Sequence, residues 1–265
     1  MSKQFSQREY WRDNLDPDNL GKRNRSENFD LREELDYYFS PEQEYALKKL
    51  WGSEGLRKKR ILEIGSGMGV FALFLARQEA DVYVVDIAPE RLGFLRKQAK
   101  KYGLTDRIHI VTASAENLPF DSNYFDAVYT KSVLIHTQLE YASHEIHRVL
   151  RPGGRGVFVE PLTGNPFAGF YRKFFGPEEW KHITKYFDDQ RMKILRRPFE
   201  KTSIRRFYFL SFCAFFWQFG WKNLSMFRLW VRALNGIDRI LFQICPPLKN
   251  LAWFSVMCME KQEEE

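Results

Sequence analysis

A short stretch of the sequence, Glu63-Ile64-Gly65-Ser66-Gly67-Met68-Gly69, combines a carboxylate with three closely spaced glycines. It lies between an apolar run at 60–63 and a helical pattern over 70–77, so we predict a turn from a strand into a helix. Glycine has no Cβ, and such a turn can therefore bring its backbone close to a ligand. Asp86 ends the next apolar run, at the spacing from which a carboxylate accepts hydrogen bonds from both hydroxyls of a ribose. The pattern predicts a site for a nucleoside.

The charge beside this turn indicates what else the ligand carries. The third glycine follows the second after one residue, which departs from the Gly-x-Gly-x-x-Gly spacing of dinucleotide-binding turns. Glu63 directly precedes the turn and would repel a pyrophosphate, whereas a carboxylate there suits an amine or a sulfonium. We therefore predict a ligand with a positive charge near its nucleoside.

The elements that must position these residues alternate along the chain. Apolar runs predict strands at 60–63, 81–86, 107–111, 125–129 and 155–160, and a last strand at 251–259. Helical patterns cover 70–77, a segment that begins at Pro89, and 139–150, and a further helix is expected over 41–52 with Ser40 as its N-cap. Strands that alternate with helices of this length indicate βαβ units and a parallel sheet.

Composition limits the alternatives. A chain of 265 residues with 44% hydrophobic residues can bury one sizeable core. Three scattered cysteines fit free thiols in a reducing compartment, and the charged N-terminus lacks an apolar secretion signal, so we expect a cytoplasmic location. The longest strongly apolar stretch, 207–219, is shorter than the ~20 residues needed to span a bilayer.

Four segments carry a resemblance to a known family: ILEIGSGMGVF, VVDIAPERL, ASAENLPFDSNYFDAV and HRVLRPGGRGVFVE. Through them the chain resembles the class I S-adenosylmethionine-dependent methyltransferases of the small-molecule type (methyltransferase domain 11/25-like). The resemblance implies a Rossmann-like, doubly wound α/β sheet of seven strands, mostly parallel with the last strand antiparallel, and extra C-terminal helices. It also implies an enzyme whose cofactor is S-adenosyl-L-methionine.

The residue pattern divides the chain into three parts, and the resemblance covers the second of them. Residues 1–40 are expected to form an arm or lid, and residues 41–161 the Rossmann-like core that binds S-adenosylmethionine. Residues 162–265 are expected to form a substrate or lid elaboration, with helices and the final strands of the same sheet.

The family's cofactor contacts carry over to named positions. Gly65 and Gly67 would face the methionine part of the cofactor, and Glu63 would orient the loop and the amine. Asp86 would hold the ribose and Ile87 would flank the adenine. Ala115 and Glu116 would lie at the adenine edge, and Lys131 and Ser132 near the amine and the transferred methyl. The complete predicted set is Glu63, Gly65, Ser66, Gly67, Gly69, Asp86, Ile87, Ala115, Glu116, Lys131 and Ser132.

Two residues are candidates for catalysis. Transfer from a sulfonium needs proximity, in-line geometry and, for a hydroxyl acceptor, a base. His136 follows the fourth strand and could be that base or a structural histidine that lines the pocket. Glu160 closes the fifth strand and could act in catalysis or make a lid contact or salt bridge. His144 and His147 share a helix face, but no third ligand is in view, and we predict no metal.

The C-terminal third is basic and aromatic. Thirteen Lys or Arg lie between positions 181 and 239, against four acids, with aromatic residues interleaved. A stripe at helical spacing runs from Met226 through Trp230, Leu234, Ile237 and Leu241 to Ile244. These features suit a membrane interface or an apolar substrate tunnel, and they equally suit core helices with a solvated charged rim.

Three functions remain open from the sequence. The first is a methyltransferase for a small-molecule or lipid-like acceptor with an apolar portion, cytoplasmic or peripheral at an anionic membrane surface. The second is a tRNA or rRNA methyltransferase, which the net charge of +7 permits, although no RNA-binding module is recognisable and a nucleic acid partner is therefore disfavoured. The third is a non-catalytic scaffold with the same fold. Neither the acceptor atom nor the oligomeric state follows from the sequence.

Overall fold

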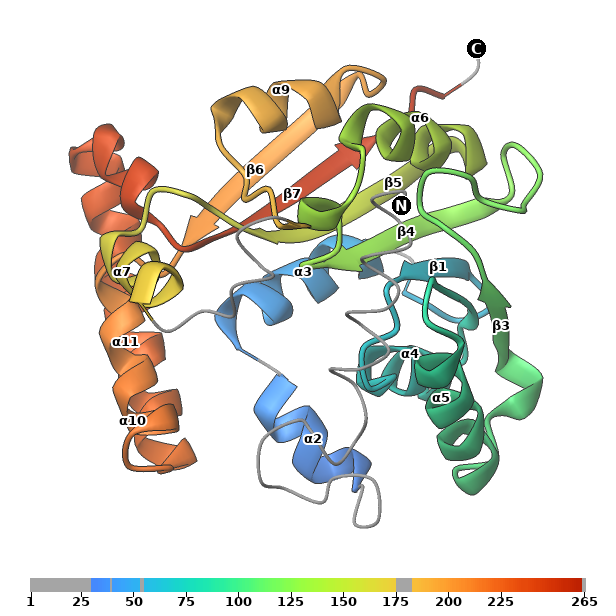
Figure 1. Cartoon of the computed structure of the whole chain (residues 1–265), viewed down its shortest axis with the longest axis horizontal. Coiled ribbons are helices and arrows are strands. Elements are labelled where there is room, and N and C mark those ends of the chain that lie inside the picture. Colours follow the sequence, from blue (N-terminus) through green and yellow to red (C-terminus); the bar gives the residue numbers. More distant parts are fainter. Residues whose placement is uncertain (1–29, 39, 53–54, 175–182, 264–265) are drawn as a thin grey trace.

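A seven-stranded sheet forms the centre of the molecule, with the strand order β3-β2-β1-β4-β5-β7-β6. In this computed structural model, the described residues are 30–38, 40–52, 55–174 and 183–263. Strands β1 to β5 are mutually parallel, whereas β7 runs antiparallel to both β5 and β6. Figure 1 shows this sheet between two layers of helices. The predicted doubly wound, mostly parallel sheet with an antiparallel last strand is thereby confirmed.

Six of the seven strands lie where the apolar runs predicted them, with differences at their ends, and β6 was not predicted. Their bounds are β1 Arg60–Ile64, β2 Asp81–Asp86, β3 Ile108–Thr112, β4 Phe125–Lys131, β5 Leu150–Pro161, β6 Lys201–Phe207 and β7 Phe254–Glu260. Strand β5 begins earlier than predicted, but its pairing with β4 jumps from Leu150 to Arg155. The intervening Arg-Pro-Gly-Gly segment contains Gly153 at φ 70°, which is why the chain leaves the ladder there.

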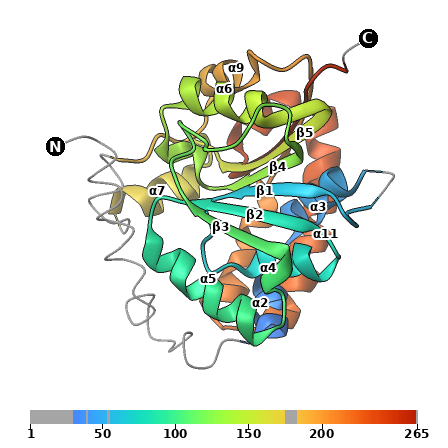
Figure 2. The same cartoon turned by 90° about the vertical axis from the view of Figure 1, so that its right-hand side faces the viewer.

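Helices cover both faces of the sheet. Their bounds are α2 Leu31–Tyr38, α3 Pro41–Trp51, α4 Val70–Arg77, α5 Pro89–Lys101, α6 Leu139–Val149, α7 Pro166–Phe174, α9 Asp189–Arg196, α10 Phe215–Phe219 and α11 Leu224–Ile244. Ser40 stands at the N-cap of α3 as predicted, yet its hydroxyl donates to the Glu42 carboxylate and makes no cap hydrogen bond to the backbone. Figure 2 shows the twisted sheet nearly edge-on.

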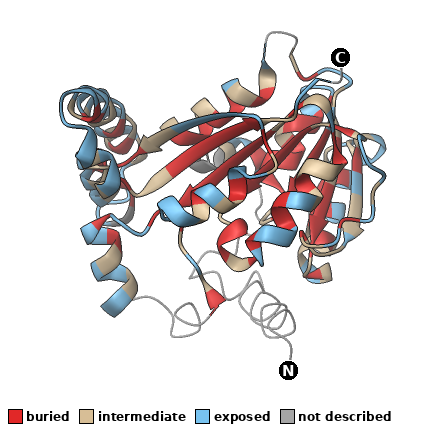
Figure 3. Ribbon diagram, turned by 90° about the horizontal axis from the view of Figure 1, so that it is seen from above, coloured by how far each residue is buried: buried red, intermediate tan, exposed pale blue. Residues whose placement is uncertain are grey.

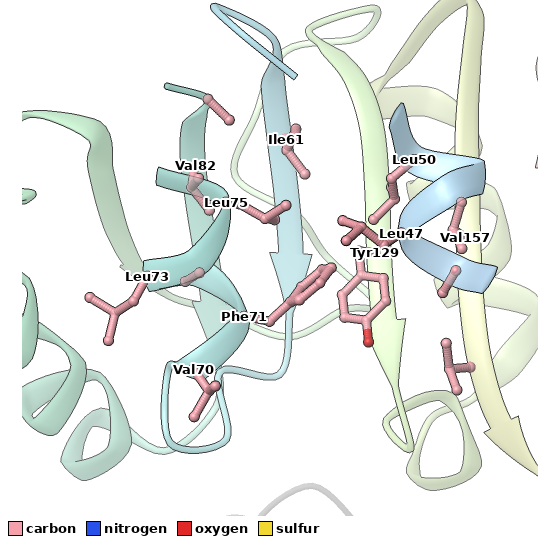
Figure 4. Close-up of a cluster of buried hydrophobic side chains, with 14 of the residues drawn as sticks. Leu47, Leu50, Ile61, Val70, Phe71, Leu73, Leu75, Val82, Tyr129 and Val157 are labelled. Atoms are coloured by element: carbon pink, nitrogen blue, oxygen red, sulfur yellow. The ribbon is translucent and has the colours of Figure 1, made fainter. Parts of the chain in front are cut away.

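Alternation along the strands builds two cores. Ile61 and Ala127 belong to the cluster under α2 to α5 and α11, whereas their neighbours Leu62 and Val128 belong to the cluster under α6 and α9. In the first cluster the rings of Phe71 and Tyr129 lie 4.1 Å apart between α4 and β4 (Figure 4). The five inner strands are buried along most of their length, whereas the edge strands β3 and β6 are more exposed (Figure 3).

The C-terminal third differs from the sequence-based expectation in two ways. The apolar stretch from 207 is not one element, because Phe207 ends the edge strand β6, which pairs with β7, and the rest forms a short 3-10 turn and α10. The second difference concerns the face of α11. Its buried residues are Phe227, Val231, Asp238 and Phe242, so the predicted stripe of Met226, Trp230, Leu234, Ile237, Leu241 and Ile244 lies beside the buried face.

Within the part of the chain that the structure describes, no helix is both long and apolar enough to cross a bilayer.

A buried carboxylate joins α11 to the segment after β6. Asp238 is 1% exposed, and its carboxylate accepts hydrogen bonds from the backbone N–H groups of Phe209, Leu210 and Ser211 at 2.8–3.2 Å. The Ser211 hydroxyl donates to the same carboxylate at 2.6 Å. A buried acid with these donors fixes the position of α11 relative to the sheet.

We expect Asp238→Ala to lower the free energy of unfolding by about 3 kcal/mol, because it leaves buried N–H donors without an acceptor. Urea denaturation measures the loss. The matched control is Asp189→Ala, whose carboxylate is 70% exposed in an ion pair with Arg206 and should contribute little. Equal effects of the two substitutions would contradict the structural importance of Asp238.

Candidate active site

A cavity of about 510 Å³ opens at the carboxyl ends of the parallel strands. Its walls come from the turn after β1, the end of β2, the segment after β3 and the segment after β4. The strand order reverses between β1 and β4, and open α/β sheets bind their ligands at such a switch point. The volume suits one small organic ligand.

The predicted glycine turn forms one wall, and its glycines have different functions. Gly65 and Gly69 have φ of 85° and 71°, and an added Cβ would stand 2.3 Å from the Val133 side chain and 2.5 Å from the Leu95 side chain, respectively. Gly67 has φ 49°, but its missing Cβ would meet nothing within 4 Å. Close packing therefore requires Gly65 and Gly69, whereas Gly67 leaves the turn open toward the cavity.

Asp86 holds the turn from the neighbouring strand. Its Oδ2 accepts hydrogen bonds from the Ser66 backbone N–H at 2.9 Å and from the Ser66 hydroxyl at 3.1 Å. Its Oδ1 accepts from the Ala88 N–H at 2.9 Å, and Arg91 lies 3.8 Å from Oδ2. The carboxylate lines the cavity and is 7% exposed, so it can still accept a further hydroxyl from a ligand.

Glu63 adds a second buried carboxylate to the same wall. It is 4% exposed, and its Oε2 has no hydrogen-bond partner among the described residues. Burial raises the pKa of Glu63 well above its usual value, and the nearby charge of Asp86 raises it further. Two adjacent buried acids favour a ligand with a positive charge, because a cation would stabilise both of them.

The opposite side of the cavity is formed by the segments after β2 and β3. Ile87 and the residues from Ala113 to Glu116 line it. Glu116 accepts a hydrogen bond from the Gln138 backbone N–H at 2.5 Å, which ties this segment to the start of α6. Arg91 also lines the cavity from the first turn of α5. A flat apolar group fits between Ile87 and this segment.

Lys131 ends β4 and carries a positive charge to the cavity. Its Nζ lies 3.5 Å from the Glu42 carboxylate, which also accepts hydrogen bonds from the hydroxyls of Ser40 and Tyr208. Burial lowers the pKa of Lys131, and Glu42 partly offsets this effect. Glu42 therefore connects α3, β4 and the end of β6 behind the cavity wall.

The turn after β4 brings Ser132 and His136 to the cavity. Ser132 has φ 55°, an uncommon conformation for a residue with a side chain, and its N–H donates to the Val159 carbonyl at 2.9 Å. His136 lies at the end of a 3-10 turn, Leu134–His136, and lines the cavity beside Thr137. An imidazole here can contact a ligand.

Glu160 lies behind this turn. It is fully buried, and it is absent from the described residues that line the cavity. Its Oε1 accepts hydrogen bonds from the Thr130 hydroxyl at 3.0 Å and from the backbone N–H groups of Val133 and Leu134 at 3.2 and 3.1 Å. Glu160 thus holds the turn after β4 and does not line the cavity, and its predicted part in catalysis stays a prediction.

The cavity brings together most of the predicted site residues. Those that line it are Glu63, Gly65, Ser66, Gly67, Asp86, Ile87, Ala115, Glu116, Lys131, Ser132 and His136, whereas Gly69 and Glu160 stand behind the lining. Sequence reasoning missed, among others, Glu34, Met68, Arg91 and Val133. Of these four, Arg91 carried a weak signal, because a cation in the first turn of a helix opposes the helix dipole and suggests a nearby acid.

The comparisons with known proteins agree with this geometry. Residues 62–158 match the sequence model of the family described as Methyltransferase domain. The match covers the strands and turns that line the cavity, so this segment is similar to a methyltransferase domain. The predicted resemblance to a methyltransferase family is confirmed over this segment.

Curated relatives are similar over the same part of the chain. The ubiquinone/menaquinone biosynthesis C-methyltransferase of Brucella canis is 38% identical over 104 residues, which are 37% of this chain and 38% of that protein. Its Bartonella henselae counterpart is 39% identical over 106 residues, 38% of this chain and 40% of that protein. The chain thus matches less than half of the length of these relatives.

Solved structures show the same fold over more of the chain. Geranyl diphosphate C-methyltransferase from Streptomyces coelicolor A3(2), in complex with Mg²⁺, geranyl diphosphate and S-adenosyl-L-homocysteine, superposes with a TM-score of 0.65 at 14% identity and covers 98% of both chains. Phosphoethanolamine N-methyltransferase 2 of Haemonchus contortus, with S-adenosyl-L-methionine, has a TM-score of 0.62 at 18% identity and covers 96% of this chain and 60% of that one.

The residues of the cavity fit S-adenosylmethionine. Asp86 can hold the ribose, and Ile87 with Ala115 can flank the adenine. The unpartnered Oε2 of Glu63 can meet the amine or the sulfonium. Lys131 lines the cavity at the end of β4 and can pair with the cofactor carboxylate.

The pH dependence of stability tests the position of Glu160. Burial raises the pKa of this carboxyl from 4.5 to about 7. The folded state therefore binds the proton more tightly than the unfolded state, and the free energy of unfolding falls as pH rises from about 4.5 to about 7, by about 3 kcal/mol. We expect Glu160→Gln to flatten this dependence in denaturant titrations.

The control is Glu140→Gln, since the Glu140 carboxylate is 63% exposed. If Glu160→Gln leaves the pH dependence of the free energy of unfolding unchanged, burial does not raise the pKa of Glu160 as described above.

Proposed function

We propose that this protein transfers a methyl group from S-adenosylmethionine to a small-molecule or lipid-like acceptor with an apolar portion. One observation carries the proposal. The buried, unpartnered Oε2 of Glu63 lies in a cavity with Asp86, so the wall is built for a cationic nucleoside ligand, within a segment that matches the methyltransferase domain.

The side chains of this site would bind and orient more than they react. Bound S-adenosylmethionine supplies a methyl group on a sulfonium, which is already an activated electrophile. Asp86 and Glu63 would fix the two ends of that group, and the turn held by Glu160 would place Ser132 and His136 near the methyl. Positioning of two reactants in line is the main contribution of such a site.

A base is needed when the acceptor loses a proton on methylation. His136 is the histidine among the described residues that line the cavity. We propose that one of its ring nitrogens would accept that proton while the acceptor atom takes the methyl group that bound S-adenosylmethionine would supply.

The relatives support an acceptor with an apolar portion. The curated relatives are named for ubiquinone and menaquinone biosynthesis, and the Streptomyces coelicolor structure contains geranyl diphosphate, which has an apolar chain. The apolar side chains of Met68, Phe71 and Val133 line the same cavity. An acceptor of this kind dissolves in membranes, and we propose that the protein reaches it at a membrane surface.

The N-terminal part would act as a lid. Glu34 on α2 lines the cavity, so the predicted arm or lid at 1–40 reaches the site at least through this helix. Residues 1–29 and Phe39 lie outside the described residues. The division of the chain at 40 and 161 stays a prediction.

Affinity for the cofactor product tests the binding residues. We expect Asp86→Ala to weaken S-adenosylhomocysteine binding by about 100-fold, because both a ribose acceptor and the anchor of the turn are lost. Glu63→Gln keeps the size of the side chain but removes its charge, and should weaken binding by about tenfold. Titration calorimetry measures both.

Asp106→Ala is the control, because Asp106 is exposed on the turn before β3. Unchanged affinity in the Asp86 and Glu63 variants would refute the assignment of the site.

The function of His136 has a separate readout. We expect His136→Ala to lower kcat by about 100-fold, to remove the limb of the pH–rate profile that reports the base, and to leave S-adenosylhomocysteine affinity within about twofold. A structural histidine would instead lower kcat and affinity together.

The assay follows S-adenosylhomocysteine release with quinone precursors, prenyl diphosphates, lipid extracts and RNA as separate acceptors. Turnover with RNA alone would overturn the proposed acceptor class.

A further inference from the structure

Helix α11 has an apolar face that no described element covers. At 3.6 residues per turn, Leu229, Ile237, Ile240 and Ile244 lie on one side of the helix, and they are 61%, 46%, 57% and 76% exposed. The opposite side carries the buried residues Phe227, Val231 and Phe242. The helix is therefore apolar on two faces, and only one of them packs against the described part of the protein.

Other exposed aromatic residues gather at the same end of the molecule. Phe216 in α10 and Trp221 just after it are 58% and 64% exposed, and α10 packs against α11. Helix α7 adds Phe167 and Phe174, and the Phe167 ring stacks on Phe212 next to α11. Among the described residues, every exposed large apolar side chain except Tyr141 and Ile204 lies within 167–174 or 210–244. We call these exposed side chains the apolar end (left in Figure 1).

The segment that carries most of the apolar end is mainly basic. From 208 to 253 the sequence contains the basic residues Lys222, Arg228, Arg232, Arg239 and Lys249, and its single acid is Asp238. Asp238 is buried and bound to backbone N–H groups, so it does not reach the surface. Arg232 pairs with the exposed Glu44 at 3.0 Å. The exposed face of this segment therefore combines apolar and cationic groups.

The arginines occupy their own side of the helix. Arg228, Arg232 and Arg239 recur at spacings of four and seven residues and so form one stripe, between the buried face and the exposed apolar face. A helix with an apolar face bordered by basic residues lies in the plane of a bilayer interface, where the apolar side chains enter the acyl region and the basic ones meet anionic headgroups.

We propose that the apolar end is a docking surface for an anionic lipid bilayer, with α11 in the plane of the interface. Two copies of this chain would bring the same positive stripe to a two-fold interface, and like charges oppose that pairing. A nucleic acid would satisfy the arginines but would leave the isoleucines and phenylalanines without an apolar partner.

The orientation of the sheet decides which way the cavity faces relative to the proposed docking surface. The arrowheads of β4 and β6 point toward the end of the molecule at which α7 and α11 lie (Figure 1). The carboxyl edge of the sheet, where the cavity opens, therefore faces the side on which the bilayer would lie. The docking itself stands on the surface alone, and only its use for an acceptor from the membrane rests on the proposed function.

Co-sedimentation of the full chain with vesicles tests the docking. One set of vesicles contains phosphatidylcholine alone, and the other contains one-third phosphatidylglycerol. We expect at least tenfold stronger binding to the anionic vesicles at about 0.1 M salt, with most of that preference lost at about 0.5 M salt. Equal binding to both compositions, or none to either, would overturn the proposal.

Variants locate the surface. Ile240→Asp should weaken binding to the anionic vesicles by about tenfold or more, because it places a charge where an isoleucine enters the acyl region. Arg239→Gln should weaken it by about fivefold. The matched control is Tyr141→Asp, since Tyr141 is 63% exposed on α6, away from the apolar end, and should leave binding unchanged.

Each variant must keep wild-type affinity for S-adenosylhomocysteine, which separates loss of docking from loss of fold or of the cofactor site. Full vesicle binding by Ile240→Asp would refute α11 as the contact. A dimer in sedimentation equilibrium that Ile240→Asp dissociates would assign the surface to a second copy and refute the bilayer as its partner.

Discussion

Two carboxylates, Glu63 and Asp86, are buried side by side at the carboxyl edge of the sheet. Burial of charged groups is unfavourable, and the properties of the site depend on which groups stabilise each carboxylate. Backbone N–H groups, the Ser66 hydroxyl and Arg91 satisfy Asp86, whereas Glu63 keeps an oxygen without a partner among the described residues. Burial of Glu63 raises its pKa, and the nearby charge of Asp86 raises it further. A bound cation would stabilise the charged form of this carboxyl. Part of the binding free energy would therefore come from the interaction of a cationic ligand with these two acids. A ligand with a sulfonium and an amine carries the positive charge that this interaction needs.

The sheet makes this arrangement possible because it sets the separation of the two acids. Strands β1 and β2 pair in parallel register, so Glu63 lies opposite Val84 and the turn after β1 reaches the end of β2 at Asp86. The other side of the cavity depends on a third buried acid. The Glu160 carboxylate accepts hydrogen bonds from N–H groups of the turn after β4 and so fixes the backbone that carries Ser132 and His136. Glu160 thus positions this turn from outside the cavity lining.

The C-terminal third completes the sheet and at the same time changes the outer surface. Strands β6 and β7 extend the sheet beyond β5, and Asp238 locks α11 against the segment that follows β6. Because α11 is held through one face, its second apolar face stays exposed beside its arginines. The same connection that stabilises the domain therefore presents a surface suited to lipid, at the end of the molecule toward which the cavity edge points.

The sequence by itself determined the class of fold and the core of the site. The period of the apolar runs, the glycine turn and the acid that closes the next strand are local signals, and local signals suffice for βαβ units and their ligand edge. Tertiary structure alone decided what depends on contacts between distant segments. Glu34, Arg91 and the link from Glu42 to Lys131 reach the site through packing of helices that the motifs do not contain. Strand β6 escaped detection because an edge strand with polar, exposed positions lacks the apolar pattern, and it forms only when β7 supplies its hydrogen bonds. Which face of α11 is buried could not be predicted either, since both faces are apolar and only the position of Asp238 against its backbone donors distinguishes them.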